Sequence, residues 1–359
     1  MKSTVDAKTF YTAVQALRTV TKTCSIPALS EVSVSFQQGR CVLRATDMET
    51  WMQIELPAQG DDFAFLFQGS NQIKTALRHL DGALTLELRQ QANAPTLIMS
   101  CGNKGGEFPV LTLEDAPIWP EFAPKQSYTA NAADILSCVK QVKYAANPRN
   151  TRTEYQGILF QGRHIWAVDG YRAACCDDAG LDVERPFSVR ASALEHLKAF
   201  GNAQMQIEVG EQDILFRTDT MQLATRLIAG AYTMTYEQVV PKNHAEVFQA
   251  DRKEFVQALQ YLLACAESKE RPTVRFCNGE MLLQTKNACY RAHIALSEES
   301  FLMIGFDAGL MLDALRQFEK QDTVTIRLSG EYSAISLLTE SSSALVLPVR
   351  LSAEAKQAA

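Results

Sequence analysis

A helix-start motif occurs three times in this 359-residue chain, at nearly constant spacing. Residues that favour the N-cap of a helix stand at Asp6, Asn131 and Asp251, so the copies are 125 and 120 residues apart. Each cap precedes apolar residues at the 3.6-residue period of a helix that buries one face. These residues are Phe10, Ala13, Val14 and Leu17; Ile135, Cys138, Val139 and Val142; and Phe255, Ala258, Leu259 and Leu262. The spacing predicts one domain written three times.

Further elements recur at the same offset. A second amphipathic helix is expected at 70–81, 192–200 and 307–318, and an alternating strand follows each, starting at Leu84, Met205 and Val324. Alternation of apolar and polar residues is typical of a sheet with one covered face. The alternative is a chance spacing of helix caps, and the matching order of strands argues against it. We therefore expect an α+β protein of three repeated domains, each with two helices packed on an antiparallel sheet. The expected boundaries are 1–124, 125–243 and 244–359.

Composition limits the class of protein. Apolar residues make up 47% and charged residues 21% of the chain, and no apolar run reaches the roughly 20 residues of a membrane span. The N-terminus lacks the apolar core of a signal peptide, and the nine cysteines include no C-x-x-C pair. We expect reduced thiols and a cytoplasmic location. The net charge of −6 argues against nucleic-acid binding unless positive charge is concentrated on one surface.

Short motifs occur in a fixed order along the repeat: PAL at 27–29, ATDME at 45–49, LF at 159–160, VDGYR at 168–172, VPKN at 240–243 and LPVRL at 347–351. Together with the triple repeat, they resemble the beta subunit of bacterial DNA polymerase III, the sliding clamp. The resemblance implies a head-to-tail homodimer of six domains that forms a ring, with helices lining the hole. Such a ring encircles double-stranded DNA without reading sequence. It tethers the DNA polymerase catalytic subunit, the clamp loader and other proteins, confers processivity, and catalyses nothing itself.

The distribution of charge fits a ring around DNA. The six expected helical windows carry a formal charge of +4 by count, so the remainder carries −10 of the total of −6. A mildly basic lining tolerates phosphates, while an acidic exterior repels them. A more ordinary explanation is that lysine and arginine are common on helix faces. The expected DNA-contacting residues are Lys22, Lys74, Arg78, Lys140, Lys143, Arg149, Arg152, Arg190 and Lys198.

The resemblance also implies an apolar cleft that holds short clamp-binding peptides between the second and third domains. An extended peptide would place one or two apolar side chains in it and hydrogen-bond at its rim. Taken alone, the apolar run at 345–347 is more typical of an ordinary buried strand. The expected cleft residues are Tyr155, Val168, Gly170, Tyr171, Arg172, Ala173, Met234, Gln238, Val239, Leu310, Leu345, Val346, Leu347, Pro348, Val349 and Arg350.

The homodimer implied by the resemblance forms by pairing of edge strands from the first and third domains. In this chain, that places 107–111 against 288–296. Pro109 cannot donate a backbone hydrogen bond, so it must either take a non-bonding position or shorten this seam. The expected interface side chains are Phe108, Val110, Cys265 and Ala266.

Catalytic and metal sites are not expected. The five histidines are dispersed, and none is spaced with a cysteine as metal ligands are. Cys175 and Cys176 are interpreted as strand residues, and Asp169-Gly170 as a turn. No nucleophile–base set stands out, so no cofactor and no catalysis are expected. The alternative function is a clamp-like protein-binding scaffold, from a mobile element or duplicated gene, that loads poorly on DNA; an enzyme on a similar fold is a more distant third.

Overall fold

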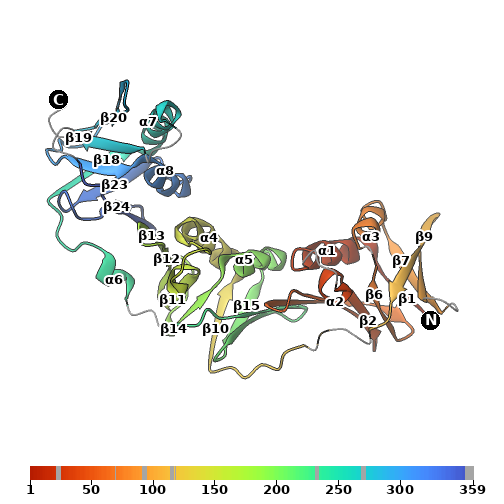
Figure 1. Ribbon diagram of the computed structural model, residues 1–359. Helices are drawn as coiled ribbons and strands as arrows, with labels where there is room; N and C mark the ends of the chain where they lie inside the picture. Colours follow the sequence, from red (N-terminus) through yellow and green to blue (C-terminus); the bar gives the residue numbers. More distant parts are fainter. Residues whose placement is uncertain are drawn as a thin grey trace. The chain divides into compact units, whose positions relative to one another are not determined.

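The computed structural model describes residues 1–21, 26–68, 70–90, 95–113, 117, 119–230, 234–267 and 272–351. Within them the chain forms two compact units, which are described separately (Figure 1). The first unit comprises 1–133 and 192–227, and the second comprises 134–191 and 228–359. None of the helices in these described ranges is both long and apolar enough to cross a membrane.

The first unit is built on a 13-stranded sheet in the order β10-β15-β16-β17-β4-β3-β2-β6-β9-β8-β7-β1-β5. Its strands are β1 (Lys2–Asp6), β2 (Ser33–Gln37), β3 (Arg40–Thr46), β4 (Thr50–Pro57), β5 (Gln59–Gly60), β6 (Phe63–Phe67), β7 (Ala83–Gln90), β8 (Pro95–Cys101), β9 (Lys104–Leu111), β10 (Gln126–Asn131), β15 (Gln204–Val209), β16 (Asp213–Arg217) and β17 (Met221–Arg226). Its helices are α1 (Ala7–Leu17), α2 (Pro27–Ser30), α3 (Ser70–Leu77) and the 3-10 helix η3 (Glu195–Phe200). Figure 1 shows α1 and α3 side by side.

The second unit contains two antiparallel sheets, ordered β14-β11-β12-β13-β25-β24-β23-β18 and β21-β20-β19-β22. Their strands are β11 (Ile158–Gly162), β12 (His164–Val168), β13 (Arg172–Cys176), β14 (Val183–Val189), β18 (Glu246–Asp251), β19 (Thr273–Cys277), β20 (Glu280–Gln284), β21 (Cys289–His293), β22 (Ile304–Asp307), β23 (Thr323–Leu328), β24 (Ile335–Leu338) and β25 (Ser342–Val346). Its helices are α4 (Ala132–Val142), η1 (Lys143–Ala145), η2 (Thr153–Tyr155), α6 (Tyr236–Val239), α7 (Arg252–Cys265) and α8 (Ala308–Gln317), while α5 (Ala191–Leu194) begins at the boundary between the units.

One backbone arrangement recurs three times. The strand before the first helix pairs with the strand after the second helix, as β1 with β7, β10 with β15 and β18 with β23. In each copy the first residue of the helix donates its N–H across this pair: Ala7 to Gly82 O, Ala132 to Ala203 O and Arg252 to Asp322 O, at 2.9, 3.0 and 2.8 Å. The repetition predicted from the sequence is therefore present in the hydrogen bonding.

The predicted caps and apolar stripes are confirmed. Asp6 accepts the N–H of Thr9 at 2.9 Å, and Asp251 accepts that of Glu254 at 2.8 Å. Asn131 accepts the N–H of Ala133 at 2.8 Å. Every stripe residue except Ala258 is buried, and Ala258 packs partly buried against the core of the second unit.

The second helix of the middle repeat differs from the prediction. Instead of one α-helix at 192–200, the chain forms the four-residue α5 and then η3. Gly201, with φ of +61°, ends the segment after only ten helical residues. Short segments often tighten into 3-10 geometry, because few i→i−4 hydrogen bonds are available to oppose it. The apolar residues Leu194, Leu197 and Phe200 remain buried as expected.

Two strand pairings join segments that are distant in sequence. In the first unit, β17 pairs with β4, from Met221 opposite Ile54 to Thr225 opposite Thr50. In the second unit, β13 pairs with β25, from Arg172 opposite Val346 to Cys176 opposite Ser342. Each pairing joins strands from two successive copies of the repeat into one continuous sheet, and we call these pairings the β17–β4 and β13–β25 joints. The β13–β25 joint contains residues of the predicted cleft.

Candidate functional site

The β13–β25 joint brings the two halves of the predicted cleft together. Ala173 lies opposite Leu345, and the N–H of Leu347 donates to the carbonyl of Tyr171 at 2.9 Å. Residues near 170 and near 346, far apart in sequence, are therefore neighbours because of backbone register rather than a side-chain contact. This register fixes which side chains share a face.

Five of the expected cleft residues belong to one apolar cluster, which we call the cleft floor. It contains Tyr155, Val168, Ala173, Val239 and Leu345. The floor also contains residues that the sequence analysis did not select for the cleft: Leu159, Trp166, Cys175, Tyr236, Val240 and Ala334. The Tyr236 hydroxyl lies 2.5 Å from Ser343 Oγ on β25, which ties α6 to the joint. The capping box of Thr235 and Gln238, readable in the sequence, is the signal that locates this helix.

Exposed apolar side chains lie beside the floor. Tyr171 is 52% exposed and Leu347 is 44% exposed, although most residues of their types are buried in folded proteins. Val168, Ala173 and Leu345 of the floor are less than 10% exposed. Exposed apolar side chains next to a buried apolar cluster are suited to an extended chain with apolar anchors.

The turn between β12 and β13 has the conformation expected of Asp-Gly. Asp169 Oδ1 accepts the N–H groups of Tyr171 and Arg172, at 2.9 and 3.1 Å. Gly170 has φ of +93°, and a Cβ there would lie 3.5 Å from the ring of Tyr155. The left-handed conformation therefore favours glycine here, whereas the Tyr155 ring, at ordinary contact distance, would leave room for a Cβ.

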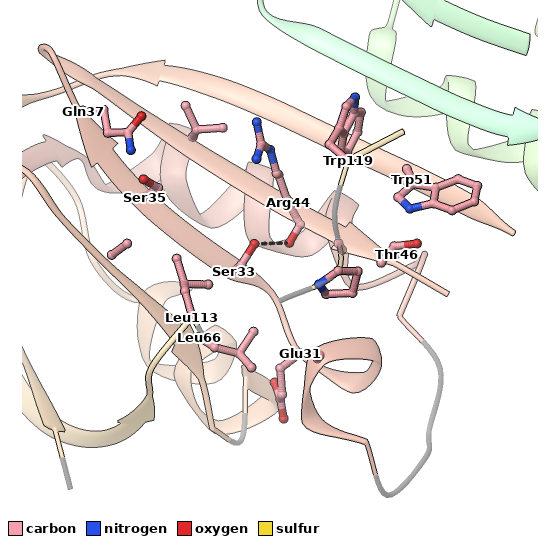
Figure 2. A pocket seen from close by; sticks show the side chains of 15 residues that line it. Glu31, Ser33, Ser35, Gln37, Arg44, Thr46, Trp51, Leu66, Leu113 and Trp119 are labelled. Carbon is pink, nitrogen blue, oxygen red and sulfur yellow. Dashed lines mark hydrogen bonds between the residues drawn. The ribbon is translucent and has the colours of Figure 1, made fainter. Parts of the chain in front are cut away.

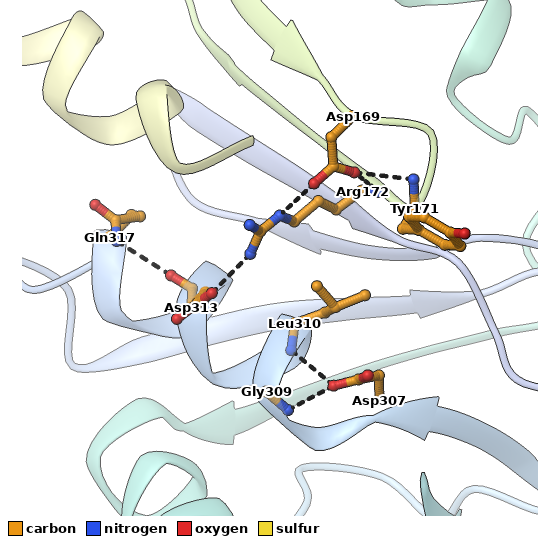
Figure 3. A network of polar contacts seen from close by, with 8 residues as sticks. All are labelled: Asp169, Tyr171, Arg172, Asp307, Gly309, Leu310, Asp313 and Gln317. Carbon is orange, nitrogen blue, oxygen red and sulfur yellow. Dashed lines mark hydrogen bonds and ion pairs between the residues drawn. The ribbon is translucent and has the colours of Figure 1, made fainter. Parts of the chain in front are cut away.

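Arg172 crosses the joint as an ionic link (Figure 3). Its Nε donates to Asp169 Oδ2 at 3.0 Å, and its Nη1 donates to Asp313 Oδ2 on α8 at 2.7 Å. The guanidinium also lies 5.0 Å from the centre of the Tyr144 ring. Its side chain is only 14% exposed. Arg172, expected as a cleft wall, thus connects the turn, η1 and α8, and the sequence analysis missed Asp313 and Tyr144 as its partners.

The segment after β25 is bound to β22. Pro348 forms a bridge with Phe306, and the N–H of Val349 donates to Gly305 O at 2.7 Å. A Cβ at position 305 would lie 2.5 Å from the carbonyl of Val349, so only glycine fits there. This close approach places the LPVRL motif against the start of α8.

The remaining expected cleft residues have other environments. Gln238 is exposed, and its Oε1 accepts the N–H of Thr235 at 3.0 Å as part of the capping box. Arg350 lies 5.7 Å from the Tyr332 ring. Leu310 donates its N–H to Asp307 at the start of α8 and is half-buried, as is Met234. Val346 is fully buried under the joint.

The expected DNA-contacting residues lie on helices and one loop. Lys22 falls outside the described residues. In the first unit, Lys74 and Arg78 lie on and just after α3, and Lys198 lies on η3. Of the expected residues in the second unit, four are exposed: Lys140, Lys143, Arg149 and Arg152. The fifth, Arg190, is half-buried and directly precedes α5.

Two Asx turns fix the loop that follows η1. Asn147 Oδ1 accepts the N–H of Arg149 at 3.1 Å, and Asn150 Oδ1 accepts the N–H of Arg152 at 3.0 Å. The Arg152 guanidinium lies 5.7 Å from the centre of the Tyr155 ring. The loop therefore presents two arginines from a hydrogen-bonded backbone, an arrangement suited to phosphate contacts.

The expected dimer strands differ in how much edge they offer. β21 is the end strand of its sheet and pairs only with β20 in the described part of the chain. β9 pairs with β8 on one side, and on the other it pairs with β6 only at Val110 and Leu111. Val110 is fully buried within the chain, whereas Phe108, Cys265 and Ala266 are half-buried.

A hollow of about 260 Å³ lies on the sheet of the first unit (Figure 2). The Arg44 guanidinium on β3 lies 5.4 Å from the Trp119 ring, and Arg44 Nε donates to Gln53 at 2.6 Å. Trp119 also packs against the cluster of Trp51, Leu215 and Ala224, which covers the β17–β4 joint. We assign these contacts to anchoring Trp119 on the sheet.

Comparison with known proteins identifies the architecture. No protein-family model matches the chain. A curated relative from Staphylococcus epidermidis, named beta sliding clamp, is 19% identical over 361 residues, covering 93% of this chain and 95% of the relative. The DNA polymerase sliding clamp of Bacillus subtilis has a TM-score of 0.85 at 17% identity, covering 98% of this chain and all of that structure. A Pseudomonas aeruginosa sliding clamp solved with griselimycin has a TM-score of 0.83 at 18% identity, with the same coverage.

The expected fold is confirmed by these comparisons. The chain has the α+β fold of the bacterial sliding clamps over nearly its whole length. The resemblance to the DNA polymerase III beta subunit, drawn from the motif order, holds for both sequence and structure.

Proposed function

We propose that this chain is a DNA sliding clamp: two copies close a ring around duplex DNA and tether the replicative polymerase, without catalysis of their own. The observation that carries the proposal is the match of fold along the whole chain at TM-scores near 0.85. A clamp holds DNA by enclosure, so the overall architecture is the functional feature. Low sequence identity is compatible with this function because enclosure requires no base-reading residues.

Retention on circular DNA tests enclosure directly. The chain, loaded with its clamp loader on nicked circular DNA, should stay bound through gel filtration in high salt. It should be lost when a restriction enzyme cuts the circle, because a ring slides off a free end. Equal retention on circles and linear DNA would contradict enclosure. A chain that binds the polymerase but is retained on neither form would instead be the clamp-like scaffold.

We place the domain boundaries of this clamp at 1–124, 125–243 and 244–359, and its location in the cytoplasm. The threefold recurrence of the β1–β7, β10–β15 and β18–β23 pairings supports this division. The ring would close by pairing of β9 with β21, the strands described above as partly or fully unpaired on one edge. Phe108, Cys265 and Ala266 would pack beside that seam, and buried Val110 would support it from within.

Light scattering over a dilution series tests the seam. We expect a species of twice the chain mass of 39.8 kDa, dissociating on dilution. Phe108→Asp should shift dissociation to higher concentration, because it places a charge in an apolar contact. The half-exposed Met48, in the turn between β3 and β4, provides a control outside the seam, Met48→Asp. A species of one chain at every workable concentration would contradict ring closure by two copies.

Partners would bind the cleft floor through short peptides with apolar anchors. The Pseudomonas clamp solved with griselimycin supports a ligand site on this fold. We expect Leu347→Ser to weaken a labelled peptide from the host polymerase at least about fivefold, because a central apolar contact is worth about 1 kcal/mol or more. The control is Phe301→Ser, which removes an apolar side chain that is 78% exposed in the same unit and should leave the peptide affinity unchanged. Unchanged affinity in Leu347→Ser would remove the cleft from the proposal.

The basic residues would contact phosphates from the ring lining. The combined change Lys140→Glu and Arg149→Glu should lower retention on DNA and reduce the steepness of its salt dependence, since each phosphate contact contributes to that slope. The combined change Lys125→Glu and Lys242→Glu, at two exposed positions outside the helices, serves as the charge-matched control. Identical behaviour of both variants would show that these residues do not face DNA.

A further inference from the structure

Three potential metal ligands converge at the edge of the β12–β13 hairpin. His164 Nδ1 lies 2.6 Å from Asp177 Oδ1, and Cys175 Sγ lies 3.2 Å from the same oxygen. One ligand atom from each residue lies within 4.8 Å of the other two. Imidazole nitrogen, thiolate sulfur and carboxylate oxygen are the donor types found together in zinc sites.

The hairpin register accounts for this convergence. Trp166 pairs with Cys175 and Ile165 with Cys176, so the next step outward brings His164 opposite Asp177. Residues 164, 166, 175 and 177 consequently share one face of the hairpin. His164 and Cys175 therefore lie on paired strands, and Asp177 directly follows the end of β13, which favours a fixed geometry for the first two ligands.

Burial differs across the cluster in a way that suits ion entry. The Cys175 residue is 1% exposed, whereas the His164 and Asp177 side chains are 22% and 48% exposed. A sulfur ligand thus lies at the base, and two ligands face solvent. An ion can reach the site without opening the fold, and the exposed carboxylate can adjust to it.

A fourth residue orients the imidazole. Glu237 on α6 lies 2.5 Å from His164 Nε2, on the side of the ring away from Asp177. When Nε2–H donates to this carboxylate, Nδ1 of a neutral imidazole presents its lone pair to the cluster. Metal-bound histidines almost always donate their other N–H in this manner. The Tyr236 ring, 5.6 Å away from the His164 ring, packs against it from α6.

We propose that His164 Nδ1, Cys175 Sγ and the Asp177 carboxylate bind a Zn²⁺ ion, with water in the fourth position. Nitrogen and sulfur donors favour Zn²⁺ over Mg²⁺ or Ca²⁺, which take oxygen ligands. On binding, the Cys175 S–H bond breaks, the sulfur pair forms the Zn–S bond, and the proton passes to solvent. In tetrahedral geometry the nitrogen and oxygen ligands lie about 3.3 Å apart, so Asp177 need shift only slightly.

The position of the ion gives the site a structural role. Cys175 belongs to the cleft floor, and Glu237 belongs to the helix that packs on it. A bound ion would join β12, β13 and, through Glu237, α6. It would therefore stabilise the elements around the cleft whether or not the chain acts as a clamp.

Cobalt substitution tests the proposal on the full chain. After chelator treatment and dialysis under reducing conditions, Co²⁺ should bind with one equivalent per chain and give a thiolate-to-Co²⁺ charge-transfer band, which Zn²⁺ then displaces. Cys175→Ser should abolish the band, and Cys277→Ser, at a cysteine outside the cluster, should retain it. Absence of the band in the unmodified chain, or its persistence in Cys175→Ser, would overturn the proposal.

Surface variants keep the test valid if Cys175→Ser disturbs the buried strand. Asp177→Asn and His164→Gln should each reduce the affinity for Co²⁺ while leaving the circular dichroism spectrum unchanged. Glu237→Ala should weaken binding by about 10- to 100-fold, the effect usual for a residue that orients a ligand. If the cluster is only an ion pair between His164 and its two carboxylates, none of these variants will change Co²⁺ binding, and the zinc site is rejected.

Discussion

Replacing Arg172 should destabilise the second unit far more than replacing its exposed partner. Arg172→Met removes the guanidinium but keeps much of the apolar stem. It leaves Asp169, whose side chain is 10% exposed, without its cation. Removing one partner of a buried ion pair typically costs about 3–5 kcal/mol. Because Asp169 keeps its two backbone hydrogen bonds, we expect the lower end, about 3 kcal/mol.

Asp313→Ala provides the contrast. The Asp313 side chain is 44% exposed, and Arg172 keeps its bond to Asp169 when Asp313 is removed. Exposed ion pairs contribute about 0–1 kcal/mol, so the free energy of unfolding should fall by less than about 1 kcal/mol. The two variants each remove an ion pair, but only Arg172→Met leaves a buried charge unpaired. The difference between their losses of unfolding free energy therefore measures the effect of burial.

Urea unfolding followed by fluorescence measures both effects. Trp166 is the one tryptophan of the second unit, so replacing Trp51 and Trp119 with Phe makes the signal specific to that unit. With a urea dependence of about 2–3 kcal/mol/M, a loss of 3 kcal/mol lowers the midpoint by about 1–1.5 M. The control is Lys253→Met, at an exposed lysine in an ion pair of 2.9 Å with Asp322, which should change little.

Two outcomes would refute this reasoning. Equal costs for Arg172→Met and Asp313→Ala would mean that the exposed bond to α8 carries the stabilisation. A cost below about 0.5 kcal/mol for Arg172→Met would place it among neutral surface changes and mean that Asp169 does not need its cation.

Three further predictions concern stability. Burial lowers the pKa of His196, so near and below about pH 6.5 the unfolded state binds more protons than the folded state. The free energy of unfolding should therefore fall as the pH drops through that range. Thermal unfolding from pH 8 to 5 should show this loss in the unmodified chain and less of it in His196→Asn. Gly279→Ala should cost at least about 1 kcal/mol more than Gly102→Ala in urea unfolding, because both have positive φ but only at 279 would a Cβ lie 2.4 Å from a carbonyl, that of Ile294. Leu259→Ala, at a fully buried position of α7, should cost about 2–5 kcal/mol, and a value near zero by calorimetry would contradict the assigned core.

The sequence predicted the local structure well because the relevant signals are local. Helix caps at Asp6 and Asp251, and the Asp169-Gly170 turn with its positive φ at Gly170, depend on residues a few positions apart. The apolar periods that follow the caps depend only on which face is buried. Each of these features can be recognised without knowing where distant segments lie.

The candidate sites were harder to predict because they depend on pairing between distant segments. Nothing near Arg172 in the sequence indicates that Asp313, 141 positions later, will accept its hydrogen bond. The His164 cluster is an intermediate case. The observed turn spans Asp169 to Arg172, and counting outward from its centre, between Gly170 and Tyr171, places His164 opposite Asp177. Counting from the Asp169-Gly170 pair recognised in the sequence would instead have placed His164 opposite Cys175. A search for metal ligands at fixed sequence spacing overlooks ligands that meet across a hairpin.

The β17–β4 and β13–β25 joints have a consequence for the evolution of this architecture. Both are made by main-chain groups, which are the same for every amino acid except proline. Selection at these joints acts on register and on the pattern of small and large side chains, and hardly at all on residue identity. Substitutions can accumulate there for as long as neither strand slips, which gives a physical reason why chains sharing fewer than one residue in five retain the same architecture.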